Sequence, residues 1–184
     1  SLLLVFRTNT AYERWWEGRK LLGSLVNNSR NLALKLASLL KDHPELKEQS
    51  RMLISNYVIA LNEHLTASHD YNSLEDDSSY PLSDVLNAKH KPNAIALQLM
   101  HFCKELVEKN IITPYELLFI NAEVSSYTDI IGACERIKKS PIPYSYSLFI
   151  KKFIFVYIMT IPIFFSSEFK YAIVQLTTFI FYVL

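Results

Sequence analysis

The chain has 184 residues, of which 19 are Lys or Arg and 18 are Asp or Glu, so its net charge is +1. Because recognition of nucleic-acid phosphates requires a concentrated basic face, this balance argues against a nucleic-acid partner. The three glycines, at positions 18, 23 and 132, do not have the spacing of a phosphate-binding loop. No convergent nucleophile, base or metal cluster is visible in the sequence. We therefore predict neither an enzymatic activity nor a cofactor.

The first predicted element, residues 1–20, is a helix that leaves a membrane. Its apolar start passes without Pro or Gly into a stretch that carries Arg7, Arg14, Trp15 and Trp16. Paired tryptophans suit the membrane interface, and the basic residues suit its cytosolic side. We therefore expect the chain to enter the cytosol after this helix.

Two amphipathic helices are predicted next. Between residues 21 and 67, apolar residues recur at three- and four-residue steps among polar ones. Pro44 divides this segment, so we expect the first helix to stop there and the second to run from about Glu45 to Leu65. Charged residues recur within every two or three turns, which is typical of soluble helices.

The polar stretch at residues 69–92 is predicted to be a surface loop with short helical pieces. Its acids near Asp70 have loop-like spacing, but the sixth and twelfth positions of a calcium-binding loop lack the required Gly and Glu. His64 and His69 are five residues apart, which is not the i,i+4 spacing of a helical zinc pair. We therefore interpret this stretch as a solvated surface and predict no metal there.

Periodicity predicts a further helix from Ile95 to Asn110. Within it, His101 and Glu105 have i,i+4 spacing, but a single such pair is weak evidence for a metal, and a surface role is preferred. Cys103 and Cys134 lack CxxC spacing and are predicted to be reduced, buried thiols.

A capping box predicts the start of the next helix. Thr113 is the expected N-cap, Pro114 occupies the first helical position, and Glu116 stands three residues after the cap. The helix should run to about Lys139, because the two prolines of the following SPIP segment end it.

The composition then changes sharply to an apolar hairpin. Residues 144–165 are long enough to span a bilayer if Lys151 and Lys152 reach back to the interface, whereas residues 171–184 end too early to cross it. The alternative of two buried helices in a soluble core is weakened by the lack of a polar stripe. Basic residues before the hairpin and after the opening helix place residues 21–140 in the cytosol.

Two stretches of the sequence resemble a known family. The first begins at Phe6 and reads FRTNTAYERWWEGRKLLGSLVNNSRNLA, and the second begins at Tyr127 and reads YTDIIGACERIKKSPIPYSYSLFIKK. Together they resemble the bestrophin family, specifically its bacterial members. The resemblance covers roughly residues 2–35 and 127–184, while the middle of the chain agrees in helical character only.

The resemblance implies an all-α subunit of a pentameric ion channel with four membrane helices and a cytosolic helical vestibule. Residues 1–20 would be the lower half of the pore-lining second membrane helix, and residues 21–143 would form the vestibule region. Residues 144–184 would be the third and a truncated fourth membrane helix. The chain is thus expected to be a fragment of the family's subunit.

The resemblance also implies positions in the ion path. Leu2 and Phe6 match the hydrophobic neck, and Ile120 or Val124 would match a second constriction in the vestibule. The acidic segment that forms the calcium clasp of animal members has no counterpart here, so calcium gating is not predicted.

Helix geometry adds an acidic face below the neck. At about 100° per residue, Leu2, Phe6, Asn9, Glu13 and Glu17 fall within an arc of roughly 80°. In a symmetric pentamer, Glu13 and Glu17 would form rings that favour cations. The alternative is that both glutamates pair with basic neighbours on a packed surface. Those neighbours are Arg14 and Lys20.

These inferences lead to one hypothesis and one alternative. The hypothesis is a bestrophin-like, multi-pass homo-pentamer in the lipid of a bacterial inner membrane, which conducts small monovalent ions. The family favours chloride, and the acidic face leaves cation selectivity open. The alternative is a non-conducting, membrane-anchored helical scaffold or sensor.

Overall fold

The structure is a computed structural model that describes residues 2–66, 68, 70–140 and 144–165; at residues 2–4, 6, 7, 144–147 and 162–165 it describes the backbone alone. The described residues form six helices and no strand, which agrees with the predicted all-α class. The chain divides into a terminal unit, residues 1–12 and 140–184, and a central unit, residues 13–139.

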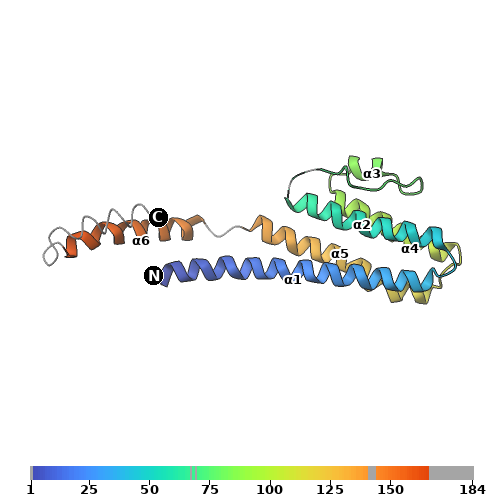
Figure 1. Ribbon diagram of the computed structural model, residues 1–184, viewed down its shortest axis with the longest axis horizontal. Helices are drawn as coiled ribbons and strands as arrows, with labels where there is room; N and C mark the ends of the chain where they lie inside the picture. Colours follow the sequence, from blue (N-terminus) through green and yellow to red (C-terminus); the bar gives the residue numbers. More distant parts are fainter. Residues whose placement is uncertain (1, 67, 69, 141–143, 166–184) are drawn as a thin grey trace. The chain divides into compact units, whose positions relative to one another are not determined.

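The first helix, α1, is continuous from Leu2 to Leu39, so the opening stretch and the first predicted amphipathic helix are one element (Figure 1). A turn follows, in which the amide of His43 donates to the carbonyl of Leu40 at 3.1 Å. Helix α2 runs from Pro44 to Thr66. Pro44 therefore begins α2, because a proline at the first helical position lacks only an amide that would be unpaired there anyway.

Helices α3 (Leu82–Asn87) and α4 (Lys91–Glu108) follow. Helix α4 begins four residues before the predicted Ile95, because the ring of His90 caps it by accepting from the amide of Asn93 at 3.3 Å. At the other end, Asn110 adopts a left-handed conformation with φ of 55°, which reverses the chain after the helix.

Helix α5, Pro114–Lys139, begins at the predicted capping box. The amide of Thr113 donates to the carboxylate of Glu116 at 2.7 Å, and the amide of Glu116 donates to the Thr113 hydroxyl at 3.3 Å. The hydrogen bonds that the amide and the hydroxyl of Thr113 donate to the Glu116 carboxylate lower its pKa, because they stabilise the ionised form. The predicted helix start and end are both confirmed.

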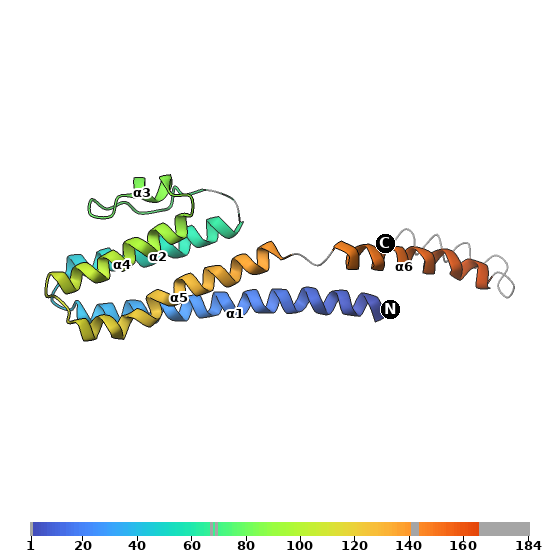
Figure 2. The same cartoon turned by 180° about the vertical axis from the view of Figure 1, so that it is seen from behind.

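The core of the central unit forms where α2, α4 and α5 pack on one another, with α3 against α4 (Figures 1 and 2). The rings of Tyr57 and Tyr127 lie 4.3 Å apart at its centre. The Tyr57 hydroxyl donates to the backbone carbonyl of Tyr127 at 2.6 Å, and the Tyr127 hydroxyl donates to Ser29 of α1 at 3.0 Å. Burial raises the pKa of Tyr127 to about 12, so this phenol stays protonated. The tyrosine pair thus connects α2, α5 and α1.

The two cysteines, Cys103 and Cys134, are free and buried, as predicted. Burial raises the pKa of the Cys103 thiol to about 12, because an apolar environment disfavours the thiolate. Neither cysteine is therefore suited to nucleophilic chemistry.

In the terminal unit, α6 runs from Tyr144 to Phe165, the same bounds as the predicted apolar segment. Several of its large side chains are exposed, including Phe149, Phe155 and Val156. Within the described residues, no helix combines the length and the apolarity needed to cross a membrane. The second predicted apolar segment, residues 171–184, lies outside the described residues.

The buried hydroxyl of Tyr57 gives a test of the core. We expect Tyr57→Phe to lower the free energy of unfolding by about 1–2 kcal/mol, because it removes a buried hydrogen bond and little volume. Thermal unfolding followed by circular dichroism measures the change. Tyr115→Phe is the matched control, since Tyr115 is 83% exposed. Equal stability of the two variants would contradict the role of this bond.

Candidate functional site

The acidic face predicted for α1 requires an uninterrupted helix, and α1 fulfils that requirement from Leu2 onward. The side chains of Leu2 and Phe6 lie outside the described ones. Glu13 and Glu17, one turn apart, are both exposed. Helix α1 therefore places two carboxylates on one face below the predicted neck positions.

The two family-like motifs meet in space, and the residues that contact one another are more than a hundred positions apart in the chain. Arg14 of the first motif donates to the carbonyl of Ile137 in the second. Arg136 donates to the carboxylate of Glu17 at 3.4 Å. We call these two interactions the motif junction. Glu17 is thus paired across helices, with Arg136.

The contact between α1 and α5 continues away from the motif junction. Asn28 donates to the hydroxyl of Ser126 at 2.7 Å. The ammonium of Lys35 forms a 2.8 Å ion pair with Glu123 and also donates to the carbonyl of Phe119 at 2.7 Å. Residue numbers rise on α1 as they fall on α5, so the two helices run antiparallel (Figure 2).

The predicted vestibule residues lie in the core. Ile120 is fully buried and Val124 is 4% exposed, and both belong to the apolar cluster of the central unit. The neighbouring Leu118 and Phe119 are 70% and 54% exposed. In this chain, Ile120 and Val124 therefore contribute to packing within the central unit.

The acids considered for metal binding make local hydrogen bonds. Asp70 accepts from the amide of Asn72 at 3.1 Å, and Asp76 accepts from the amide of Leu82 at 2.7 Å. Glu105 pairs with Lys109 at 2.9 Å, and that hydrogen bond is the main cause of the lowered pKa of Glu105. These carboxylates organise turns and helix surfaces.

A cluster that the sequence did not predict lies beside the motif junction. Glu135 of α5 contacts the Nε2 atoms of His64 and His90 through one carboxylate oxygen, at 2.7 and 2.9 Å. Its other oxygen accepts from Lys139 at 2.9 Å. Hydrogen bonds from Lys139, then His90 and His64, lower the pKa of Glu135 to about 2. We call His64, His90 and Glu135 the histidine–glutamate cluster.

Sequence spacing gave no signal for this cluster. His64 lies near the end of α2, His90 caps α4, and Glu135 belongs to the second motif. Along the chain, His64 has only His69 as a near histidine neighbour, and local spacing carries no information about the distant His90 and Glu135. The packing of α2 and α4 against α5 brings the three side chains together.

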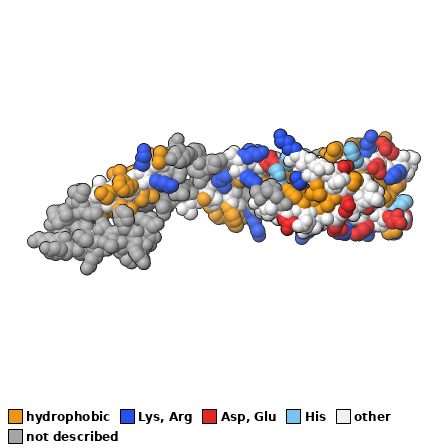
Figure 3. Space-filling view, turned by 90° about the horizontal axis from the view of Figure 1, so that it is seen from above, with side chains coloured by type: hydrophobic (Ala, Val, Ile, Leu, Met, Phe, Trp, Pro, Cys, Tyr) orange, Lys and Arg blue, Asp and Glu red, His pale blue; other side chains and the backbone are white. Residues whose placement is uncertain are grey.

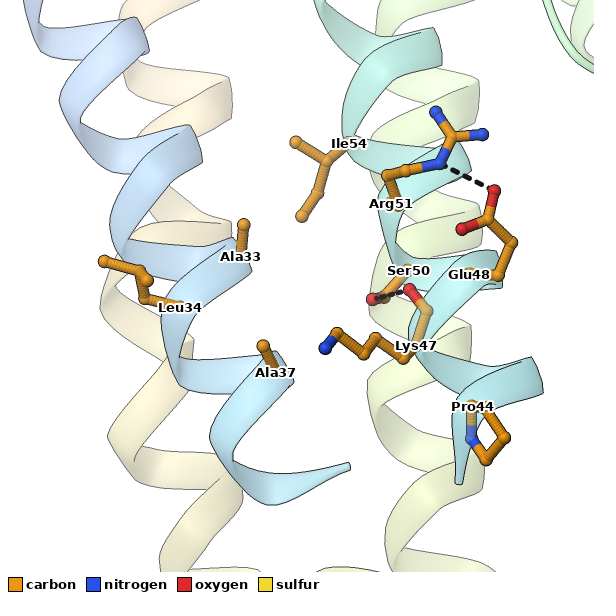
Figure 4. Close-up of a pocket in the computed structure, with 9 residues that line it drawn as sticks. All are labelled: Ala33, Leu34, Ala37, Pro44, Lys47, Glu48, Ser50, Arg51 and Ile54. Atoms are coloured by element: carbon orange, nitrogen blue, oxygen red, sulfur yellow. Dashed lines mark hydrogen bonds and ion pairs between the residues drawn. The ribbon is translucent and has the colours of Figure 1, made fainter. Parts of the chain in front are cut away.

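A shallow groove lies between α1 and α2, near the turn that joins these two helices (Figure 4). It has a volume of about 420 Å³ and a floor of small and apolar side chains. At its rim, Arg51 pairs with Glu48 at 2.7 Å and with Glu75 at 2.6 Å, so this guanidinium is already engaged. Figure 3 shows acidic, basic and apolar side chains interspersed over the central unit. The groove therefore does not provide a catalytic constellation.

Solved structures with the same fold include bacterial bestrophin homologues. The chain has the fold of a bacterial Bestrophin homolog from Klebsiella pneumoniae, with a TM-score of 0.87 to one point-mutant crystal structure over 99% of this chain and 67% of the other. A crystal structure of that homolog with a different point mutation gives a TM-score of 0.85 over 99% of this chain and 68% of the other. Sequence identities are 19% and 20%, so these likenesses establish the fold alone.

The sequence then establishes the family. The profile of the bacterial and fungal bestrophin proteins matches residues 1–184, so the chain belongs to the bestrophin family. It is 34% identical over 169 residues to a voltage-dependent anion channel-forming protein of Synechocystis sp.. It is 26% identical over 185 residues to the chloroplastic voltage-dependent chloride channel 1 of Arabidopsis thaliana. The predicted family resemblance is confirmed.

The matches cover most of this chain but only part of the relatives. The Synechocystis match covers 88% of this chain and 54% of that protein, and the Arabidopsis match covers 96% and 43%. The chain thus spans about half the length of these relatives.

The carboxylate of Glu135 gives a pH-dependent prediction. Because its pKa is lowered from 4.5 to about 2, its stabilising effect is fully present above about pH 4.5 and is lost as the pH falls toward 2. We expect Glu135→Gln to lower the free energy of unfolding at neutral pH by about 2 kcal/mol, since hydrogen bonds to charged groups are lost.

Thermal unfolding measured from pH 7 to acid tests this expectation. The variant should lose less stability than the wild type between pH 4.5 and 2. The control is Glu108→Gln, because Glu108 is exposed and pairs with Lys104 on the surface of α4. Parallel pH profiles for Glu135→Gln and wild type would contradict the prediction.

Proposed function

We propose that this chain is part of the subunit of a homo-pentameric anion channel in a bacterial inner membrane. The observation that carries the proposal is the 34% identity, over 88% of the chain, to a protein named as voltage-dependent anion channel-forming. The buried thiols and hydrogen-bonded carboxylates described above favour a non-enzymatic role. Chloride is the proposed permeant ion.

In the proposed subunit, residues 1–20 line the pore and α6 is a membrane helix. Leu2 and Phe6 would form rings of a hydrophobic neck, which gates by dewetting. The exposed aromatic side chains of α6 support this assignment, because a large exposed apolar surface indicates a lipid or protein contact. Residues 171–184 would continue the membrane domain.

The central unit, with residues 21–143, would form the cytosolic vestibule. Its charged, mixed surface suits a water-filled environment (Figure 3). Ile120 or Val124 stays our proposal for the vestibule constriction, although their burial makes intrasubunit packing the competing role. Conductance of alanine variants at these two positions would separate the roles.

The acidic face of α1 affects the preference of the proposed channel for anions or cations. Rings of Glu13 and Glu17 would attract cations, which opposes chloride conduction. Arg136 lies 3.4 Å from Glu17 and offsets its charge. Glu13 is therefore the stronger candidate for an electrostatic filter, and its effect decides between anion and cation preference.

Reversal potentials test the permeant ion. With the full-length protein in planar bilayers and asymmetric NaCl, we expect the reversal potential to shift toward the chloride equilibrium potential. Glu13→Gln should increase the anion preference by removing a ring of negative charge, whereas Glu48→Gln on α2 should leave it unchanged. A shift toward the sodium potential would overturn chloride selectivity. A pentamer that passes no current would support the scaffold alternative.

Single-channel conductance tests the neck. We expect Phe6→Ala to raise the conductance, because a ring of smaller side chains widens the constriction and is easier to wet. The matched control is Phe149→Ala on α6, where the exposed ring is assigned to the membrane-facing surface. Unchanged conductance of Phe6→Ala would place Phe6 outside the ion path.

A further inference from the structure

We propose that the histidine–glutamate cluster is a binding site for a divalent transition-metal ion, with zinc as the ion that fits its ligands best. His64, His90 and Glu135 each offer one ligand atom, and these atoms all lie within 4.8 Å of one another. Among the described residues, this is the one group of three such side chains that converges in this way.

The distances are close to those of a metal site. The carboxylate oxygen of Glu135 lies 2.7 Å from Nε2 of His64 and 2.9 Å from Nε2 of His90. Zinc binds N and O ligands at about 2.0–2.2 Å, so two ligands of a tetrahedral ion lie roughly 3.3 Å apart. The two glutamate–histidine distances would have to lengthen by roughly half an ångström to admit the ion, and all three ligand atoms already lie within 4.8 Å of one another.

The donor chemistry selects the class of metal. Two imidazoles and one carboxylate are a ligand set that zinc uses, whereas calcium and magnesium prefer oxygen ligands. The side chains of His64 and His90 are 28% and 32% exposed, and that of Glu135 is 18% exposed. An ion could thus enter from solvent, and a water molecule could complete its coordination.

Metal binding requires a proton shift in each imidazole ring. In the structure, each Nε2 lies within hydrogen-bond distance of Glu135, and Nδ1 of His90 accepts from the amide of Asn93 at 3.3 Å. An imidazole that binds metal through Nε2 carries its proton on Nδ1. Metal binding would therefore move the ring proton from Nε2 to Nδ1, and in His90 this breaks the 3.3 Å cap of α4, because a protonated Nδ1 cannot accept from the amide of Asn93.

One charged neighbour, Lys139, contacts a ligand side chain, while Lys138 and Glu63 make hydrogen bonds elsewhere. Lys139 donates to the second oxygen of Glu135 at 2.9 Å, which leaves the first oxygen for the metal. Lys138 donates to the backbone carbonyl of His64 at 3.0 Å. Glu63 accepts from the hydroxyl of Ser68 and from the amide of Asp70. Lys139 would thus act as an outer-shell partner that orients the ligating carboxylate.

Such an ion would link three helices. His64, His90 and Glu135 come from α2, the start of α4 and the last turns of α5. Binding to this folded arrangement and not to the unfolded chain stabilises the fold by mass action. The site is independent of ion conduction, so its test does not depend on the proposed channel.

Zinc titration into the metal-free, full-length protein in detergent tests the proposal. Isothermal titration calorimetry with ZnCl₂ should give one site per subunit. His64→Ala and His90→Ala should each weaken zinc binding by at least about 100-fold, because losing an outer-shell partner alone costs 10–100-fold. The matched control is His101→Ala, an exposed histidine at i,i+4 from Glu105.

A spectroscopic measurement on the wild type keeps the proposal testable if a variant fails to fold. Cobalt(II) should give the intense visible absorption of a four-coordinate site, and zinc should abolish it. The weak spectrum of the hydrated ion would overturn the proposal. Equal zinc affinities of His64→Ala, His90→Ala and wild type would overturn it as well, as would loss of binding in His101→Ala alone.

Discussion

The side-chain contacts between the antiparallel helices α1 and α5 attach the long first helix to the core of the central unit. Side chains of both helices connect them by hydrogen bonds, from the motif junction at one end to the Lys35–Glu123 ion pair at the other. At the motif junction, Arg14 donates a hydrogen bond to a carbonyl in the last turn of α5, where carbonyls lack partners within the helix. Because α1 continues without a break to the proposed neck residues, the same helix belongs to the core contact and to the proposed pore.

Side chains of helix α5 contact three neighbouring elements. Tyr127 packs against Tyr57 of α2, Arg136 reaches Glu17 of α1, and Glu135 contacts His64 and His90. Consecutive motif residues point about 100° apart on a helix, so Glu135 and Arg136 reach different partners. Neighbouring residues in this short stretch of α5 therefore contact different helices. Each one secures a different contact.

The sequence predicted the helices well where a local signal existed. The Thr113–Glu116 capping box and the prolines after Lys139 fixed the ends of α5, because capping depends on residues within one turn. The role of Pro44 was harder to predict, since a proline can end one helix or begin the next. The start of α4 was missed because an unusual cap, the ring of His90, extends it. The neck residues of α1 stay predictions from family resemblance.

The sequence by itself determined the all-α class, most helix bounds and the family, because periodicity, caps and motif residues are local properties of the chain. The tertiary structure decided which side chains meet. It paired Glu17 with Arg136, buried Ile120 and Val124, and assembled His64, His90 and Glu135 from three elements. The physical reason is that helix packing sets the rotation and register of each helix. One residue of register turns a side chain by about 100°, which is enough to move it from the core to solvent.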